Sequence, residues 1–358
     1  MAQLRPQFSK TSLNIKGIIS QLILSEYFIL VLSMVSFIIL IPIIPVIATP
    51  VNLSNLFSNI WPLLAIAIGQ TFVLIIAGID LSQGSIMAVV SVVGAMVMTN
   101  QVNPILFEKS PIWGVFITEK GGLLAGNPAA VSVALLVMLF TGTLIGFLNG
   151  FAIARFKIPD FMVTLVTQIF FSSIAIFLVK SENIIHLPDS FNNLGDGSLW
   201  LIPYSMLITV TLGIFAQWML SRTVFGKWLY AVGTNIRASV ISGVPTQKVI
   251  IMAYTFSGFC AAVGAILYSA RLEGGRPTLG ASLLLDIIGA AVIGGSSLAG
   301  GKGKVLWTLF GVIFLMLLGN ALSLLNVPYF TIYIVKGGII LAAALLDVSR
   351  TRIMQRGG

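Results

Sequence analysis

Runs of about 20 apolar residues recur along the whole chain, with no long polar region between them. A helix needs about 20 such residues to cross a hydrocarbon core of about 30 Å. The chain has 358 residues, of which 57% are hydrophobic and 9% charged, whereas about 25% of residues are charged in soluble domains. The sequence therefore predicts an integral membrane protein, and no soluble catalytic domain fits it.

These runs predict an all-α fold, that of a polytopic membrane protein with about ten transmembrane helices. The expected spans are residues 27–48, 56–77, 84–98, 129–153, 160–179, 200–219, 249–270, 284–298, 305–325 and 329–347. The third and eighth spans are short and rich in glycine, so some helices are expected to be broken or re-entrant. One transmembrane domain thus covers residues 27–348, between an N-terminal segment (1–26) and a basic tail (349–358).

The distribution of basic residues predicts the orientation of the spans. An even number of spans places both termini on one side, and that side receives fourteen Lys and Arg residues against five on the other. Cytoplasmic loops carry such an excess, so both termini are expected in the cytoplasm and membrane lipid is expected around the spans. The basic residues are scattered singly and form no stripe, so the net charge of +9 does not indicate binding to nucleic acid.

An internal repeat is visible at an offset of 169 residues (328 minus 159). Residues 148–166 read LNGFAIARFKIPDFMVTLV, and residues 317–335 read LLGNALSLLNVPYFTIYIV. The matched glycine, proline and phenylalanine fall where a helix, a break and a second helix are expected. Because Pro159 falls on the cytoplasmic side and Pro328 on the other, the sequence predicts an inverted repeat, as in many transporters.

The sequence GIDLSQGS, residues 78–85, interrupts an apolar run from Leu56 to about Met98 that is twice as long as one span. The chain must turn back there, and the run's only charged side chain, Asp80, lies in the turn. Asp80 and Ser82 are suited to cap the next helix. Alternatively, Asp80 lines a polar path or fixes a hinge, because an ionisable group at membrane depth is costly and usually faces a cavity. Both interpretations can hold together.

Other polar residues within the spans are candidates for the same path or hinge. They are Gln70, Asn149, Thr164, Gln168 and Asp286, which with Asp80 and Ser82 make a set of seven candidates. Hydrogen bonding between helices is the alternative explanation for each of them.

No catalytic residue, metal site or cofactor site is expected. His186 and Cys260 are the only residues of their types and have no ligand partners at suitable spacing. The glycine-rich loop 292–304 lacks the pattern of a phosphate-binding loop, since Ser296 stands where glycine is needed and Gly303 follows the lysine. Serine, histidine and aspartate occur without a nucleophile elbow.

Residues 221–248 form the longest internal loop and contain a helical stretch, Asn235 to Ser242, ended by Gly243 and Pro245. A short helix followed by Gly-x-Pro makes a rigid protruding element. The loop is either an ordinary interfacial helix or a docking element for a cytoplasmic partner.

Four motifs in order give a more specific indication. They read GIDLSQGSIMAVVSVVGAMV, LNGFAIARFKIPDFMVTL, FGKWLYAVGTNIRASVISGVPTQKV and LDIIGAAVIGGSSLAGGKGKVLWTLFG. Over residues 56–348 this set resembles the membrane permeases of bacterial ABC importers for ribose and related monosaccharides. The resemblance implies a non-enzymatic subunit of the inner membrane that moves a sugar by alternating access. It also implies a second permease subunit, ATP-binding subunits in the cytoplasm and a periplasmic or external sugar-binding protein.

Within this family's pattern, five residues resemble the element that couples to the ATPase, namely Gly233, Asn235, Ala238, Ser242 and Gly243. A Glu-Ala-Ala coupling triplet is absent, since the matching residues are Ile236, Arg237 and Ala238. The insertion at residues 100–127 also departs from the pattern, and it is either a partner-specific surface or a tolerated loop.

Three rival functions follow from the same composition: a secondary carrier driven by an ion gradient, a membrane-embedded enzyme acting on lipids, and a channel. A proton-coupled carrier more often needs several buried carboxylates or histidines. A lipid enzyme needs clustered His, Asp or Glu at the membrane ends, which the sequence does not show. The identity of the sugar, and whether the second permease is a copy or a sister chain, stay open.

Overall fold

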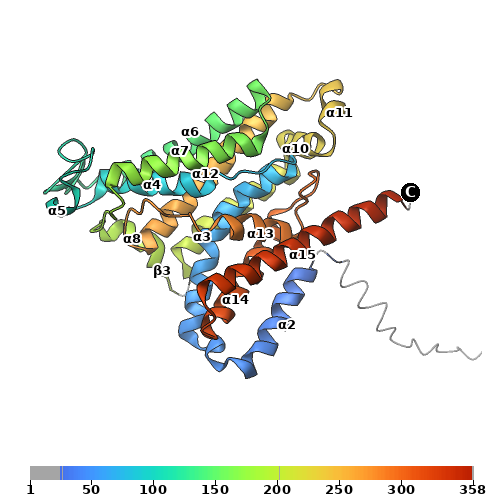
Figure 1. Ribbon diagram of the computed structural model, residues 1–358, viewed down its shortest axis with the longest axis horizontal. Helices are drawn as coiled ribbons and strands as arrows, with labels where there is room; N and C mark the ends of the chain where they lie inside the picture. Colours follow the sequence, from blue (N-terminus) through green and yellow to red (C-terminus); the bar gives the residue numbers. More distant parts are fainter. Residues whose placement is uncertain (1–24, 26, 201, 357–358) are drawn as a thin grey trace, which may run out of the picture.

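A computed structural model describes residue 25, residues 27–200 and residues 202–356, with side chains described as far as residue 345. Ten apolar helices account for most of it (Figure 1): α2 (Phe28–Ile43), α3 (Pro50–Ile75), α4 (Gln83–Met98), α6 (Ala130–Phe156), α7 (Asp160–Val179), α9 (Tyr204–Arg222), α12 (Thr246–Arg271), α13 (Leu284–Gly294), α14 (Val305–Leu324) and α15 (Tyr329–Arg356). Each coincides with one predicted span. Six of them are long and apolar enough to cross a membrane, and four are shorter apolar helices. The predicted all-α, polytopic fold is confirmed.

Several boundaries differ from the predicted ones, and the second helix starts at Pro50, six residues before the predicted span. The first span stops at Ile43 and continues as a short 3-10 helix, η1 (Pro45–Ala48), while the eighth ends at Gly294. The last helix runs on to Arg356, so the backbone of the predicted basic tail is helical as far as that residue. Apart from residue 25, the predicted N-terminal segment lies outside the described residues.

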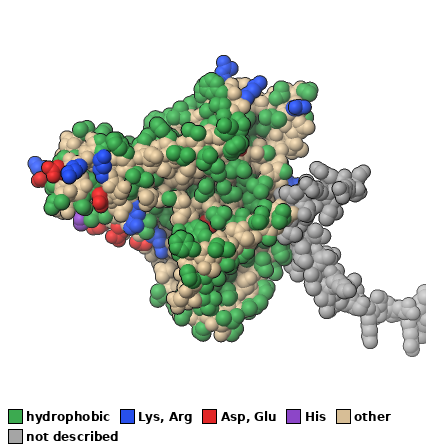
Figure 2. Space-filling model, in the orientation of Figure 1, with side chains coloured by type: hydrophobic (Ala, Val, Ile, Leu, Met, Phe, Trp, Pro, Cys, Tyr) green, Lys and Arg blue, Asp and Glu red, His purple; other side chains and the backbone are tan. Residues whose placement is uncertain are grey.

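The smaller elements gather at two ends of the molecule. One end holds α5 (Pro104–Phe107), the antiparallel pair β1 (Ile117–Thr118) and β2 (Gly121–Gly122), α8 (Asp189–Asp196), and the pair β3 (Ser198–Leu199) and β4 (Ile202–Pro203). The other end holds α10 (Val224–Thr234) and α11 (Ile236–Ile241). We call these the α8 end and the α11 end. In Figure 2 charged side chains lie at these ends, and the surface between them is largely apolar.

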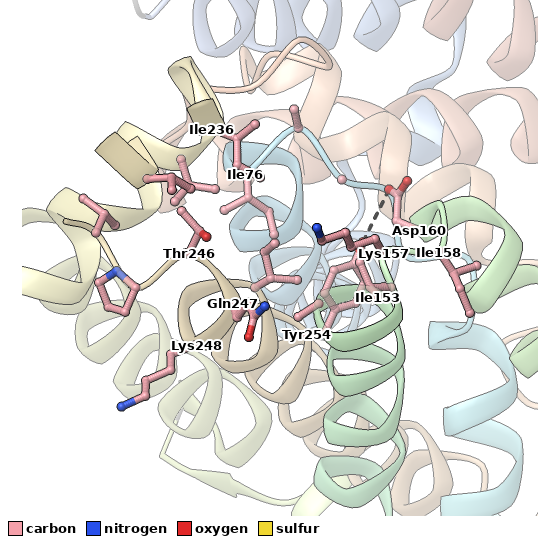
Figure 3. Close-up of a pocket in the computed structure, with 18 of the residues that line it drawn as sticks. Ile76, Ile153, Lys157, Ile158, Asp160, Ile236, Thr246, Gln247, Lys248 and Tyr254 are labelled. Atoms are coloured by element: carbon pink, nitrogen blue, oxygen red, sulfur yellow. Dashed lines mark hydrogen bonds between the residues drawn. The ribbon is translucent and has the colours of Figure 1, made fainter. Parts of the chain in front are cut away.

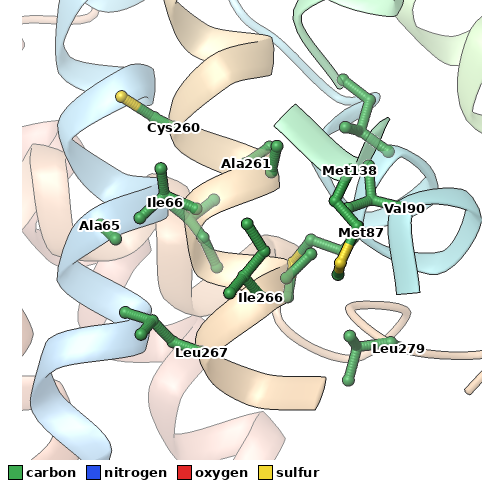
Figure 4. Packing of buried hydrophobic residues seen from close by; sticks show 14 of the residues in the cluster. Ala65, Ile66, Met87, Val90, Met138, Cys260, Ala261, Ile266, Leu267 and Leu279 are labelled. Atoms are coloured by element: carbon green, nitrogen blue, oxygen red, sulfur yellow. The ribbon is translucent and has the colours of Figure 1, made fainter. Parts of the chain in front are cut away.

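Helices α3 and α12 pack against each other at the centre of the bundle. Both are largely buried, and in Figure 4 Ile66 and Cys260 lie between their backbones. Gly69 makes this approach close, because a Cβ there would lie 2.8 Å from the Cβ of Cys260 and 2.9 Å from the Cα of Ser257. Lipid tails are as apolar as leucine, so close packing through small residues, and not the hydrophobic effect, favours this contact in a membrane.

The two halves of the chain have matching contacts. Helix α6 packs against α12 and α4, whereas α14 packs against α3 and α13. Lys157 and Asn326, which are 169 residues apart (326 minus 157), both have a φ of 55° in the turn after α6 and after α14. The carbonyl oxygens of Pro159 and Pro328 then each accept a bond from the backbone N–H three residues on. The structure thus supports the predicted repeat.

The repeat is inverted. The turn after α6 lies at the α11 end, where Asp160 contacts the residues that follow α3. The end of α14 lies beside the start of α3 instead, where Asn52 and Asn320 exchange two side-chain hydrogen bonds of 2.8 and 3.0 Å. The two helix turns therefore occupy opposite ends of the bundle.

The short helices α4 and α13 both follow non-helical segments, as expected for broken spans. The segment before α13 runs along α4, because Gly275 packs against Ala95 and Gly280 against Gly84. Gly280 has a φ of 84°, and a Cβ there would lie 2.9 Å from the Cα of Gly84. The beginnings of the two half-length helices are thereby brought close together inside the bundle, an arrangement typical of transporter binding sites.

Candidate functional site

The residues between α3 and α4 form a break in the helical backbone around the buried Asp80. Ala77 has a φ of 61°, which reverses the chain after α3. The Asp80 carboxylate accepts bonds from the Ser82 N–H (2.9 Å), the Ser82 hydroxyl (2.6 Å) and the Ser257 hydroxyl (2.7 Å). Its cost of burial is therefore offset by three hydrogen bonds.

The expectation that Ser82 caps α4 through its side chain is wrong, whereas the Asp80 side chain does bond a backbone N–H at the start of α4, that of Ser82. Ser82 occupies the cap position, but its side chain makes no capping bond. Its φ of −79° and ψ of −10° are already helical, whereas a capping residue needs extended backbone. The Ser82 hydroxyl is used to bond Asp80 instead.

Around Asp80 lies a buried polar network that we call the break cluster: Asp80, Ser82, Gln83, Asn149, Thr167 and Ser257. The Asn149 amide donates to the Ser82 hydroxyl (2.9 Å) and accepts from the Thr167 hydroxyl (2.7 Å). The Gln83 amide donates to the Ser257 hydroxyl (2.8 Å). The cluster joins α4, α6, α7 and α12 at the point where the backbone is broken.

Thr164 and Gln168 lie on α7 beside this cluster. The Thr164 hydroxyl lies 3.3 Å from the carbonyl oxygen of Ile79, to which it donates, and the Gln168 side-chain oxygen accepts from the Ser85 N–H at 3.0 Å. Five of the seven residues predicted for a path or hinge, Asp80, Ser82, Asn149, Thr164 and Gln168, thus meet around one structural feature.

Gln70 and Asp286 do not join them. Gln70 is fully buried on α3, and within the described part of the chain neither of its amide atoms has a hydrogen-bond partner. Asp286 lies near the start of α13 and forms an ion pair with Lys336 of α15, at 2.8 Å. Its position is thus explained by a contact between helices.

The predicted coupling residues lie at the α11 end. The Asn235 side chain caps α11 by accepting from the Ala238 N–H at 3.0 Å, and Gly243, with a φ of 78°, ends it. Asn235, Ala238, Ser242 and Gly243 are exposed. The side chain of Ile241, 87% exposed, projects from the same short helix.

Gly233 differs from the other four because it is buried at the end of α10. A Cβ there would collide with the carbonyl oxygen of Ile75 and lie 2.7 Å from the Gly301 nitrogen. The Tyr230 hydroxyl donates to the Gly303 carbonyl at 2.7 Å, and burial raises the pKa of Tyr230 above its ordinary value. Helix α10 therefore packs against the end of α3 and against the loop between α13 and α14.

A pocket of about 830 Å³ opens beside α11 (Figure 3). Aliphatic side chains from α6, α11 and α12 line much of it, including Ile153, Ile236 and Ile250. Asp160, Tyr254 and Gly78 also line it, and they adjoin the residues of the break.

Several of these residues were missed at the sequence level. Ser257 and Thr167 lie in apolar spans that hold other hydroxyl residues, such as Thr255 and Thr164, and no local pattern distinguishes them. The predicted loop 221–248 also contains helix α10, whose start is marked by Thr223, since its hydroxyl accepts from the Gly226 N–H. Asp160 follows a proline at the start of an apolar span, and that position could have indicated it.

Inverted halves, a central backbone break with a buried polar network and a largely apolar exterior define the class of protein as a membrane transport protein. The chain belongs to the family described as the permease component of the branched-chain amino acid transport system, whose model matches residues 52–344. It is therefore an integral membrane protein. No solved structure matches the chain.

Relatives cover most of the chain. It is 32% identical over 300 residues to the ribose import permease protein of Haemophilus influenzae, covering 83% of this chain and 84% of the relative. It is 30% identical to the L-arabinose ABC transporter permease protein of Azospirillum brasilense, covering 86% and 83%. The xylose transport system permease protein of Haemophilus influenzae is 28% identical, covering 85% and 90%. These are transport subunits, so the chain is a transport subunit and not an enzyme.

Proposed function

We propose that this chain is the membrane subunit of an ATP-driven importer that moves a monosaccharide across the bacterial cytoplasmic membrane. The observation that carries the proposal is the match to ribose, arabinose and xylose permeases over more than four-fifths of each chain. The substrate is a pentose or a related sugar. This relationship favours ATP-driven import over the ion-gradient-driven carrier.

The break cluster is chemically suited to a neutral, hydroxyl-rich solute. It presents amides and hydroxyls, which can both donate and accept hydrogen bonds, and its one carboxylate is already bonded on both oxygens. The adjacent starts of α4 and α13 resemble the discontinuous helices at which transporters bind solute. We therefore place the sugar path beside the break, with Asp80, Ser82, Asn149, Thr164 and Gln168 along it.

The unpartnered amide of Gln70 is a further candidate for the path. A buried amide without partners costs free energy, unless water or solute bonds to it. In contrast, we assign Asp286 to helix packing through its ion pair with Lys336.

The α11 end is the proposed docking face for the ATP-binding subunits. An exposed aliphatic side chain such as Ile241 is well suited to a partner surface. Asn235, Ala238, Ser242 and Gly243 shape this element, and Gly233 anchors it on α3. The α8 end, with the insertion at residues 100–127, would then face the external sugar-binding protein, and alternating access would require a second permease subunit.

Reconstitution tests the proposal directly. The chain is co-purified with its ATP-binding subunit, reconstituted in liposomes and supplied with the external binding protein. Uptake of labelled ribose, arabinose and xylose is then measured with ATP, with a non-hydrolysable ATP analogue and after ion gradients are collapsed. We expect uptake of at least one sugar that requires ATP hydrolysis and survives loss of the gradients. Uptake that follows an ion gradient without an ATPase would refute the proposal.

A further inference from the structure

Helix α7 carries one polar face on an otherwise apolar helix. Asp160, Thr164, Thr167 and Gln168 follow each other at spacings that place them on one side. The rest of α7 is mostly exposed or half-buried, and apart from Thr164 only Ala175 and Val179 are buried. Helix α7 packs mainly against α4 and has far less contact with α6. Its attachment to the bundle therefore depends strongly on this polar face.

The polar face of α7 binds the backbone of the break. The Asp160 carboxylate accepts from the Ile79 N–H, and the Thr164 hydroxyl, one helical turn on, donates to the Ile79 carbonyl. One turn further, the Gln168 side chain accepts from the Ser85 N–H. These side chains bond backbone groups that have lost their helical partners. Helix α7 thus holds the break in its present shape.

Asp160 also touches the helix that continues from the coupling element. The Tyr254 hydroxyl, on α12, lies 3.4 Å from the same carboxylate oxygen that bonds Ile79. Helix α12 begins at Thr246, directly after α11 and the turn at Gly243, and Tyr254 lies eight residues on, about 12 Å along the helix. A displacement of α11 is therefore carried by a rigid helix to the Asp160 contact.

These groups close the floor of the pocket beside α11. In Figure 3 Asp160 and Tyr254 lie together at the inner side of the pocket. Gly78 fills the space between them, because a Cβ there would lie 2.7 Å from the Tyr254 hydroxyl and 3.3 Å from Asp160. Val73 is fully buried beside Gly78. No side chain larger than hydrogen fits at residue 78 without separating this contact.

We propose that Asp160 is the latch of the inner gate, a positioning residue that holds α7 on the break and is released when the coupling element moves α12 and Tyr254. The pocket of about 830 Å³ is then the vestibule through which the solute leaves. This inference rests on the proposed transport function. In this proposal α7 is the helix that moves, and its bonds to Ile79 hold the gate closed.

The first test is a leak assay on the permease alone. Vesicles are loaded with labelled ribose, and its efflux is followed without ATP. Asp160→Ala is expected to raise the efflux on the order of tenfold, the factor for one lost hydrogen bond to a charged acceptor. Tyr254→Phe, which removes only the hydroxyl, should raise it by a smaller factor. The matched control is Asp189→Ala, because Asp189 is also the first residue of a helix that follows a proline. It should leave the efflux unchanged.

The second test needs no solute. Val73→Cys is introduced after replacing the single native cysteine, Cys260, by serine, and labelling by a membrane-impermeant maleimide is timed from the α11 side. Asp160→Ala should accelerate the labelling on the order of tenfold, and Asp189→Ala should not. If Asp160→Ala fails to insert, Tyr254→Phe takes its place in both assays.

The outcomes separate the two proposals. Normal ATP-driven uptake by the wild type, with efflux and labelling unchanged in both Asp160→Ala and Tyr254→Phe, would overturn the latch and leave the transport function standing. Accelerated labelling in the variants, with no ATP-driven sugar uptake by the wild type, would support the latch and refute the sugar importer.

Discussion

The buried ion pair between Asp286 and Lys336 allows a quantitative test of the packing of α15. The Lys336 ammonium lies 2.8 Å from Asp286, and the two side chains are only 10% and 6% exposed. Lys336 also lies 5.7 Å from the ring centre of Tyr333, whose hydroxyl donates to the Ser282 carbonyl. Helix α15 is thus attached to α13 and to the segment before it by polar contacts within an apolar bundle.

Lys336→Met removes one partner and leaves the Asp286 carboxylate buried without its countercharge. Breaking a buried pair in this way costs about 3–5 kcal/mol of unfolding free energy. The double variant Asp286→Leu, Lys336→Met removes both charges, and replacing such a pair by apolar side chains of similar volume is often neutral or stabilising. We expect the double variant to recover most of the loss, to within about 1–2 kcal/mol of the wild type.

The assay is a denaturant titration of the purified protein in mixed micelles, with helix content as the signal. The matched control is Asp196→Asn, which breaks the Arg271–Asp196 pair at 4.0 Å on the surface. That pair is 18% and 55% exposed, so its loss should cost no more than about 1 kcal/mol. A single Lys336→Met variant as stable as the wild type would contradict the reasoning, and so would a double variant less stable than the single one.

Three further predictions concern the two ends and the centre of the molecule. Ile241→Asp at the exposed tip of α11 should abolish co-purification of the ATP-binding subunit. The control Ile105→Asp, at an equally exposed position of the insertion (85%), should leave co-purification intact. If the ATP-binding subunit co-purifies with both variants, α11 is excluded as the docking element. Ser257→Val deprives the Asp80 carboxylate of a donor and should lower the unfolding free energy by about 1–3 kcal/mol in the same titration. The comparison is Thr211→Val, which loses only a bond to its own helix and should be close to neutral. In Gly243→Val the new Cβ meets no atom within 4 Å, but a branched residue is forced to a φ of 78°. Strain of about 1–3 kcal/mol should therefore distort the end of α11 and lower sugar uptake per ATP hydrolysed. Unchanged uptake per ATP would show that this backbone geometry is not needed for coupling.

The repeat illustrates how far sequence reasoning extends. The match of Gly150 with Gly319 and of Pro159 with Pro328 was sufficient to predict two related halves. The equal φ of 55° at Lys157 and Asn326 was not predictable, because lysine rarely adopts a left-handed conformation and nothing local marks it. The turn adopts that conformation because the helices on both sides are fixed by their packing.

The candidate site shows the same division. Asp80 was conspicuous as the only charge in a long apolar run, and Asn149, Thr164 and Gln168 as polar residues within spans. Their hydrogen-bond partners could not be recognised from the sequence, since Ser257 lies 177 residues from Asp80 along the chain. The expected cap by Ser82 failed for a related reason, because its hydroxyl, which could cap an isolated helix, is here bonded to the buried Asp80 carboxylate.

The sequence by itself determined the membrane environment, the number of apolar helices, the repeat and the short helix ended by Gly243, because each depends on composition or on neighbours within a few turns. The tertiary structure decided which polar groups meet. Burial without water makes an unpaired polar group costly, so most such groups find a donor or an acceptor, and many of those partners come from helices that only the fold brings together. That is why Asp80 bonds Ser257, Asp160 holds Ile79, and Lys336 neutralises Asp286.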